Sequence, residues 1–159
     1  MFISCVFISH YVHATDYTIS DGTTQTSRVT LTNSDTLTIE SGGTLNYYWP
    51  AVDADNRSFS SGTTQVTNGG TITGAGYLVD FRSSTNATLV NNGTMTATSS
   101  SRALYINNST NTTITNNGTA NGFGATGAVN WQTSIKTAGF VAVSGEGYFV
   151  DTTSGSITV

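Results

Sequence analysis

The chain has 159 residues, which is enough for one domain, and 36 % of them are hydrophobic, so it can form a buried core. Only 9 % are charged, against a norm of about 25 %, and the net charge is −4. The five Lys and Arg residues are single and well separated, which argues against nucleic-acid binding because phosphate neutralisation needs several closely placed cations.

Residues 1–14, MFISCVFISHYVHA, form an apolar segment that differs in composition from everything after it. The segment is too short to span a bilayer, and its last three residues suit signal-peptidase cleavage before Thr15. We therefore predict a secretory signal peptide over residues 1–14. A first core strand is the alternative, because no Lys or Arg precedes the apolar run.

The cysteine and both histidines of the chain lie in this segment, at Cys5, His10 and His13. A mature chain that begins at Thr15 therefore has no disulfide, no cysteine nucleophile, no histidine base and no Cys/His zinc site. We expect no catalytic residue, no cofactor and no bound metal.

Short runs from Thr15 to Asn46 alternate apolar residues with threonine. This period of two predicts strands with one apolar face. The predicted strands are residues 17–19, 29–31, 37–39 and 44–45, and the predicted turns are 21–22, 33–35 and 41–43.

Residues 47–62 break this rhythm and form the longest predicted irregular segment. Long loops on a regular scaffold often carry binding residues, so we consider this segment a candidate ligand-binding loop. A cap in which the aromatic residues cover the end of the core is the alternative. The candidate binding residues are Tyr47, Tyr48, Trp49, Asp53, Asp55 and Arg57.

A nine-residue unit, TLVNNGTMT at residues 88–96, recurs along the chain. The other copies are LTIESGGTLN at 37–46, QVTNGGTIT at 65–73 and TITNNGTAN at 113–121. The glycine before threonine falls at positions 43, 70, 93 and 118, at intervals of 27, 23 and 25 residues. Repeats of this length are typical of solenoids and propellers.

A second set of apolar runs, at residues 77–81, 103–106 and 128–131, keeps the same period. Two or three short strands per repeat predict an all-β fold, a parallel β-helix with coils of about 23–27 residues. Asn68, Asn91 and Asn116 would then stack as an amide ladder. The glycines two positions later would lie at turns that need positive φ.

Alternating runs continue at residues 140–143, 148–150 and 157–159, and the sequence stops inside the last of them. A solenoid end without a cap exposes unpaired backbone groups. We therefore expect this chain to be a fragment of a longer protein.

The segments DYTISDGTT and VTLTNSDTLTIESGGTL, followed by repeated NNGT and NGGT units, resemble the passenger domains of Gram-negative autotransporters. The resemblance covers residues 15–159. It implies a right-handed parallel β-helix that is exported and displayed on the outer membrane or released, and that acts in adhesion or self-association. The implied partners are host or bacterial cell-surface molecules, together with a C-terminal membrane barrel that would lie beyond this N-terminal fragment.

A polysaccharide lyase or glycoside hydrolase is the enzymatic alternative, because parallel β-helices include both, and such enzymes need clustered carboxylates. The candidates are Asp53, Asp55, Asp80 and Arg82. Asp80 and Arg82 share one face of a predicted strand, where a simple ion pair explains them. No charged pair recurs near an aromatic sugar platform in the repeats.

An ice-binding face is a further alternative, since Thr71-Ile72-Thr73 and Thr94-Met95-Thr96 would form flat threonine rows. That function needs strict spacing between rungs, and intervals of 27, 23 and 25 residues are uneven.

Overall fold

The computed structural model describes residues 14–32, 34–55, 63–82, 84, 86–98, 104–107, 112–121, 134–137 and 156–158. All regular structure in these ranges is β, and every strand pairing is parallel. No helix long and apolar enough to cross a membrane occurs in these ranges. The predicted signal peptide lies almost wholly outside them, at residues 1–13, as do the predicted strands at 128–131, 140–143 and 148–150.

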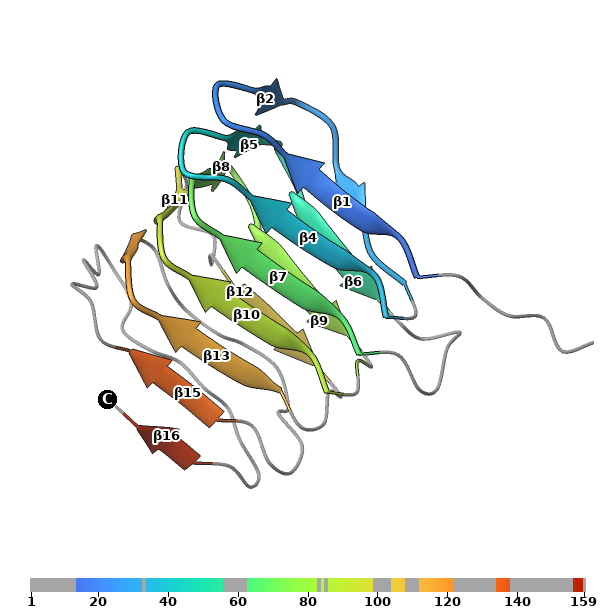
Figure 1. The fold of residues 1–159 in the computed structure, drawn as a ribbon. Helices are drawn as coiled ribbons and strands as arrows, with labels where there is room; N and C mark the ends of the chain where they lie inside the picture. Colours follow the sequence, from blue (N-terminus) through green and yellow to red (C-terminus); the bar gives the residue numbers. More distant parts are fainter. Residues whose placement is uncertain are drawn as a thin grey trace, which may run out of the picture.

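The strands form three sheets, and over residues 16–121 successive strands pass from one sheet to the next (Figure 1). The first sheet contains, in order, β1 (Asp16–Ile19), β4 (Thr36–Ile39), β7 (Gln65–Asn68), β10 (Thr88–Asn91), β13 (Thr113–Asn116), β15 (Ser134–Thr137) and β16 (Ser156–Thr158). The second sheet contains β2 (Thr24–Gln25), β5 (Thr44–Asn46), β8 (Thr71–Gly74), β11 (Thr94–Ala97) and β14 (Thr119–Asn121). The third contains β3 (Val29–Thr30), β6 (Val52–Asp55), β9 (Val79–Arg82) and β12 (Leu104–Asn107).

Each repeat contributes one strand to each sheet over the part of the chain that all three sheets cover, and we call such a set of strands a tier. The predicted all-β, parallel architecture is confirmed, and the stacked tiers are compatible with a parallel β-helix. Strands β1, β3, β4 and β5 lie where the alternation predicts them. The sequence missed β2, whose two residues carry no apolar side chain.

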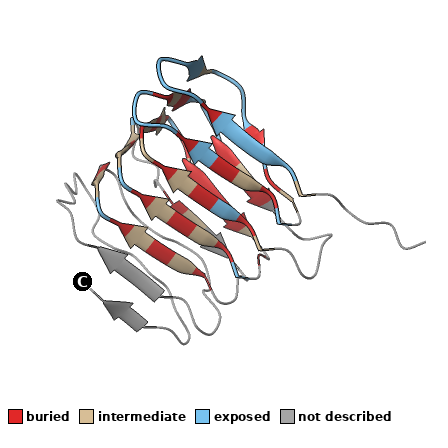
Figure 2. Ribbon diagram, viewed as in Figure 1, coloured by how far each residue is buried: buried red, intermediate tan, exposed pale blue. Residues whose placement is uncertain are grey.

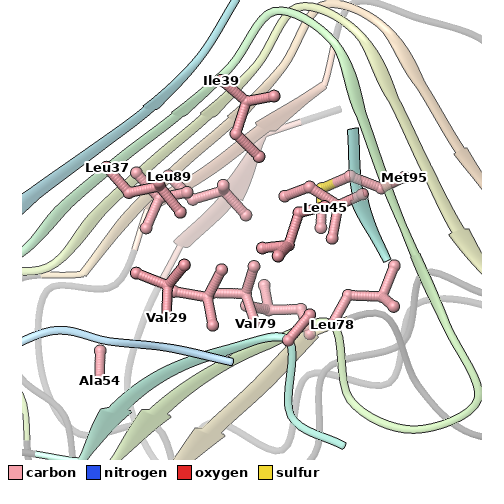
Figure 3. Packing of buried hydrophobic residues seen from close by; sticks show 14 of the residues in the cluster. Val29, Leu37, Ile39, Leu45, Ala54, Leu78, Val79, Leu89 and Met95 are labelled. Atoms are coloured by element: carbon pink, nitrogen blue, oxygen red, sulfur yellow. The ribbon is translucent and has the colours of Figure 1, made fainter. Parts of the chain in front are cut away.

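The alternation of side chains divides each strand into an inward and an outward row. Burial alternates along β10 and β13, where Leu89 and Ile114 are fully buried and their threonine neighbours are partly exposed (Figure 2). The inward residues of the three sheets meet in one core (Figure 3). Fully burying one such aliphatic side chain stabilises a protein by about 1.5–3 kcal/mol, so the inward row is the main source of stability.

Paired strands keep strict register although the repeats differ in length. In the second sheet Thr44, Thr71, Thr94 and Thr119 are aligned in one outward row. Leu45, Ile72 and Met95 are aligned in the inward row beside them. The length differences are therefore taken up between strands. Uneven intervals in the sequence do not make the rungs uneven.

The predicted amide ladder is confirmed in the first sheet. Asn68 Nδ2 donates to Asn91 Oδ1 at 2.7 Å, and Asn91 Nδ2 donates to Asn116 Oδ1 at 2.6 Å. All three side chains are fully buried. The same Nδ2 atoms also donate to the backbone carbonyls of Thr94 and Thr119 in the second sheet. The ladder therefore ties two sheets together as well as successive tiers.

The repeated glycines have a different cause from the one predicted. Positive φ occurs among the described residues at Gly22, Ser34 and Asn86, and not at the repeat glycines. A Cβ atom at Gly93 would lie 2.1 Å from the carbonyl oxygen of Gly70, and one at Gly118 would lie 2.1 Å from that of Gly93. Close approach of the preceding tier therefore requires glycine at these positions.

Candidate functional site

The predicted binding loop is divided by the structure into a short connection and a strand. Tyr47, Tyr48 and Trp49 lie between β5 and β6, and Tyr48 and Trp49 are 71 % and 47 % exposed. Asp53 and Asp55 do not lie in a loop, because residues 52–55 form strand β6. The last candidate, Arg57, lies outside the described residues.

The placement of Asp53 and Asp55 follows from the alternation Val52-Asp53-Ala54-Asp55. Val52 and Ala54 are fully buried in the core. Period-two alternation therefore places Asp53 on the outward face of the third sheet. There Asp53 lies at the same register position as Thr30 on β3 and Asp80 on β9.

The carboxylate of Asp53 forms an ion pair with an arginine of the preceding tier. Arg28 Nη1 donates to Asp53 Oδ2 at 2.7 Å. This hydrogen bond raises the pKa of Arg28 above its ordinary value, against the opposing effect of burial. The Arg28 side chain is 41 % exposed and that of Asp53 is 17 % exposed, so solvent partly screens this ion pair. The other carboxylate oxygen, Asp53 Oδ1, is buried and has no hydrogen-bond partner among the described residues.

The carboxylate of Asp80 forms a more enclosed ion pair with Arg82. Arg82 Nε lies 2.9 Å from both carboxylate oxygens of Asp80, and its Nη2 also donates to Oδ2. The Asp80 side chain is 0 % exposed, whereas that of Arg82 is partly exposed. The ion pair expected from their shared face is confirmed, and its bidentate geometry is the strong form of arginine–carboxylate pairing.

An aromatic row lies beside these charges. The rings of Trp49 and Tyr77 meet edge to face at 5.2 Å between centroids, and those of Tyr77 and Tyr105 stack at 4.7 Å. The Arg82 guanidinium lies 5.5 Å from the centroid of the Tyr105 ring. Room for Trp49 depends on Gly76, because a Cβ atom there would lie 2.8 Å from Trp49 Cβ.

The sequence missed this grouping. No charged pair recurs beside an aromatic platform in the repeats of the sequence, but the structure sets one such pair, Asp80 and Arg82, beside Tyr105 in the third sheet. The available signal was the strand register, which sets Tyr105 directly beside Asp80. However, the stacked faces of Tyr77 and Tyr105 contact each other, so the main role of this aromatic row is to pack successive tiers together.

The charged cluster offers restricted chemistry. Two carboxylates on the outward face are engaged by guanidinium groups, Asp53 by Arg28 and Asp80 by Arg82. Within the described ranges, no three His, Cys, Asp or Glu residues come together in a group suited to a metal ion. In this cluster each of these two aspartates is therefore neutralised by a neighbouring arginine.

A groove borders the Tyr47–Trp49 connection at the margin of the second sheet. Its volume is about 560 Å³. Hydroxyl and amide side chains line it at Thr26, Asn46, Thr73 and Thr98. Tyr47 and Tyr48 supply aromatic surface, and Gly74 and Ala75 complete the lining. Two of the predicted binding residues thus border a concave, uncharged surface.

No protein-family model matches the chain, and no curated protein or solved structure matches it either.

Proposed function

We propose that the chain is a right-handed parallel β-helix of the autotransporter-passenger type, exported and displayed at the cell surface, where it mediates adhesion or self-association without catalysis. The parallel tiers of three sheets support the helical architecture. Right-handedness follows from the strong preference for right-handed crossovers between parallel strands. The repeat provides a rigid scaffold, and its outward side chains provide the contacts.

The observation that carries the non-catalytic assignment is the state of the outward carboxylates. Asp53 and Asp80 are each bonded to an arginine, and Asp80 is fully buried. A glycosidase needs one carboxyl group that donates a proton and a second that acts as base or nucleophile on an accessible sugar. An enclosed carboxylate held by a bidentate arginine is poorly suited to either role.

The full chain coupled to beads tests this proposal. We expect the beads to adhere to cell surfaces or the free chain to self-associate in sedimentation velocity, with no product released from a panel of neutral and acidic polysaccharides. Polysaccharide cleavage that is lost in Asp53→Asn or Asp80→Asn would instead establish the enzymatic alternative.

An ice-binding face is the second candidate, and the strand register favours it. Thr24, Thr44, Thr71, Thr94 and Thr119 form one continuous outward row in the second sheet, despite the uneven repeat lengths. The row beside it is less uniform, because Asn46 and Thr73 share it. Thermal hysteresis of the purified chain, lost in Thr71→Leu, would support this candidate, and its absence would remove it.

A further inference from the structure

The groove on the second sheet arises from one row of residues with unequal side chains. Asn46 pairs with Thr73, and Ala97 pairs with Gly74. Continuing this register by one or two residues brings Tyr48, Ala75 and Thr98 to equivalent positions in three successive tiers. The methyl group of Ala75 thus lies between the phenol ring of Tyr48 and the side chain of Thr98. The hollow follows directly from the small side chain of Ala75.

The groove also extends along the stacking direction. Thr26 follows the first strand of the second sheet, Asn46 and Thr73 belong to the next two, and Thr98 follows the fourth. Neighbouring parallel strands are about 4.8 Å apart, so four tiers span roughly 14 Å. This length suits a short oligomer better than a single small molecule.

The groove lining is free of charge and rich in groups that both donate and accept hydrogen bonds. Threonine hydroxyls and an asparagine amide supply both functions. Tyr48 is 71 % exposed, so its ring offers an apolar face to a ligand. The volume of about 560 Å³ falls within the range of about 300–1,000 Å³ that is usual for small-ligand sites.

This combination matches the chemistry of an uncharged sugar. A pyranose ring presents an apolar C–H face, which stacks on an aromatic ring, and a rim of hydroxyls, which pair with amides and hydroxyls. An anionic glycan would need cationic partners, and none of the lining residues in the described part of the chain is Lys or Arg. The nearest arginine in sequence to Thr26, Arg28, is bonded to Asp53 on the third sheet.

We propose that this groove binds a neutral oligosaccharide, with the Tyr48 ring as the stacking surface and with Asn46 and Thr73 as hydrogen-bonding partners. The inference rests on the proposed adhesive function and names its ligand class. Trp49 takes no part, because its ring packs on Tyr77 at the third sheet.

Isothermal titration of the full chain with neutral glucose hexasaccharides in β-1,4, β-1,3 and α-1,4 linkage tests the proposal. We expect at least one neutral hexasaccharide to bind and a hexagalacturonate, an acidic hexasaccharide, to bind at least 10-fold more weakly. Tyr48→Ala should raise the Kd at least 10-fold, and Thr73→Val, which keeps the side-chain shape, should raise it about 3-fold. Tyr17→Ala removes an exposed tyrosine of the first sheet and is the matched control, with no change expected.

Absence of binding by all three neutral hexasaccharides would overturn the proposal, as would equal binding of the hexagalacturonate. A Kd that is unchanged in both Tyr48→Ala and Thr73→Val would do the same. Bead adhesion measured on the same variants distinguishes oligosaccharide binding in the groove from the broader proposal of an adhesive function. Adhesion that persists in Tyr48→Ala while no hexasaccharide binds would refute the groove and leave the adhesive function standing.

Discussion

The outward faces of the second and third sheets are built on the same inward pattern but carry opposite chemistry. The second sheet presents rows of threonine and asparagine without charge, such as Thr44, Thr71 and Thr94. The third sheet carries the two arginine–aspartate pairs and the stacked rings of Tyr77 and Tyr105. In the third sheet the polar groups and rings contact one another. In the second, hydroxyls and amides line an open groove.

We infer from this difference that the repeat constrains the inward-facing side chains, whereas the outward-facing side chains can vary between sheets. Inward positions are buried and aligned in both sheets, so they must stay apolar and of suitable size. Outward positions are limited mainly by their neighbours in adjacent tiers. The outward face of the third sheet consequently forms bonds between tiers, whereas that of the second sheet keeps its polar groups at the surface. The following substitutions test this division, in order of decreasing expected effect.

Arg82→Ala should be the most damaging change on either face. It removes the bidentate partner of the fully buried Asp80 carboxylate, and losing one member of a buried pair costs about 3 kcal/mol or more. The matched change on the uncharged face, Thr71→Ala, should cost about 0.5 kcal/mol. Urea unfolding followed by circular dichroism measures both. Equal losses would remove the distinction between the faces.

Asn91→Leu tests the core that both faces share. The substitution keeps the branching at Cγ but removes the middle of the amide ladder, so buried groups of Asn68 and Asn116 lose partners at a cost of about 2–3 kcal/mol. Asn92→Leu is the control, because the Asn117–Asn92 hydrogen bond of 2.9 Å is exposed. The free energy of unfolding should fall much less in the control, and a reversed order would refute the structural role of the ladder.

Tyr77→Ala compares the two kinds of aromatic residue. Tyr77 contacts the rings of both Trp49 and Tyr105, and each aromatic pair contributes about 0.5–1.5 kcal/mol, so a loss of about 2 kcal/mol is expected. Tyr48→Ala should change the free energy of unfolding in urea by less than about 0.5 kcal/mol, because the side chain is mostly exposed. A large loss of stability in Tyr48→Ala would mean that this ring is structural.

Among the four principal substitutions, Arg28→Ala should reduce stability least, although it also breaks an ion pair of the third sheet. Its partner Asp53 is near the surface, and exposed pairs contribute about 0.2–1 kcal/mol. The loss should shrink further at 1 M salt, where the Debye length is about 3 Å. Thermal unfolding at low and high salt measures this, and a salt-independent loss would show that the pair behaves as a buried one.

The sequence was sufficient to predict features that depend on periodicity. Alternation placed β1, β4 and β5, and the recurrence of Asn68, Asn91 and Asn116 at equivalent positions predicted a ladder that the hydrogen bonds confirm. Such features depend on spacing along the chain, which a sequence displays directly.

Features that depend on neighbouring tiers were missed or misinterpreted. The glycines were assigned to positive φ, whereas at Gly93 it is the Gly70 carbonyl of another tier that excludes a Cβ. Strand β6 was hidden because the adjacent aromatics and the only proline outweighed a four-residue alternation. The groove depends on Ala75 lying between Tyr48 and Thr98, which becomes visible only once the register is known.

The buried amide ladder has a polarity. Asn68 donates to Asn91, and Asn91 donates to Asn116. The row therefore begins at the Asn68 Oδ1 acceptor, which has Ile39 as its strand neighbour, and ends at the Asn116 Nδ2 donor. Neither atom has a hydrogen-bond partner among the described residues. A strand that slipped by one residue would turn its asparagine to the outside and leave its neighbours' amides unsatisfied, at about 1–3 kcal/mol for each group. The row thus reinforces the register that the inward apolar side chains of the same strands already favour, because a slip would expose both kinds of residue.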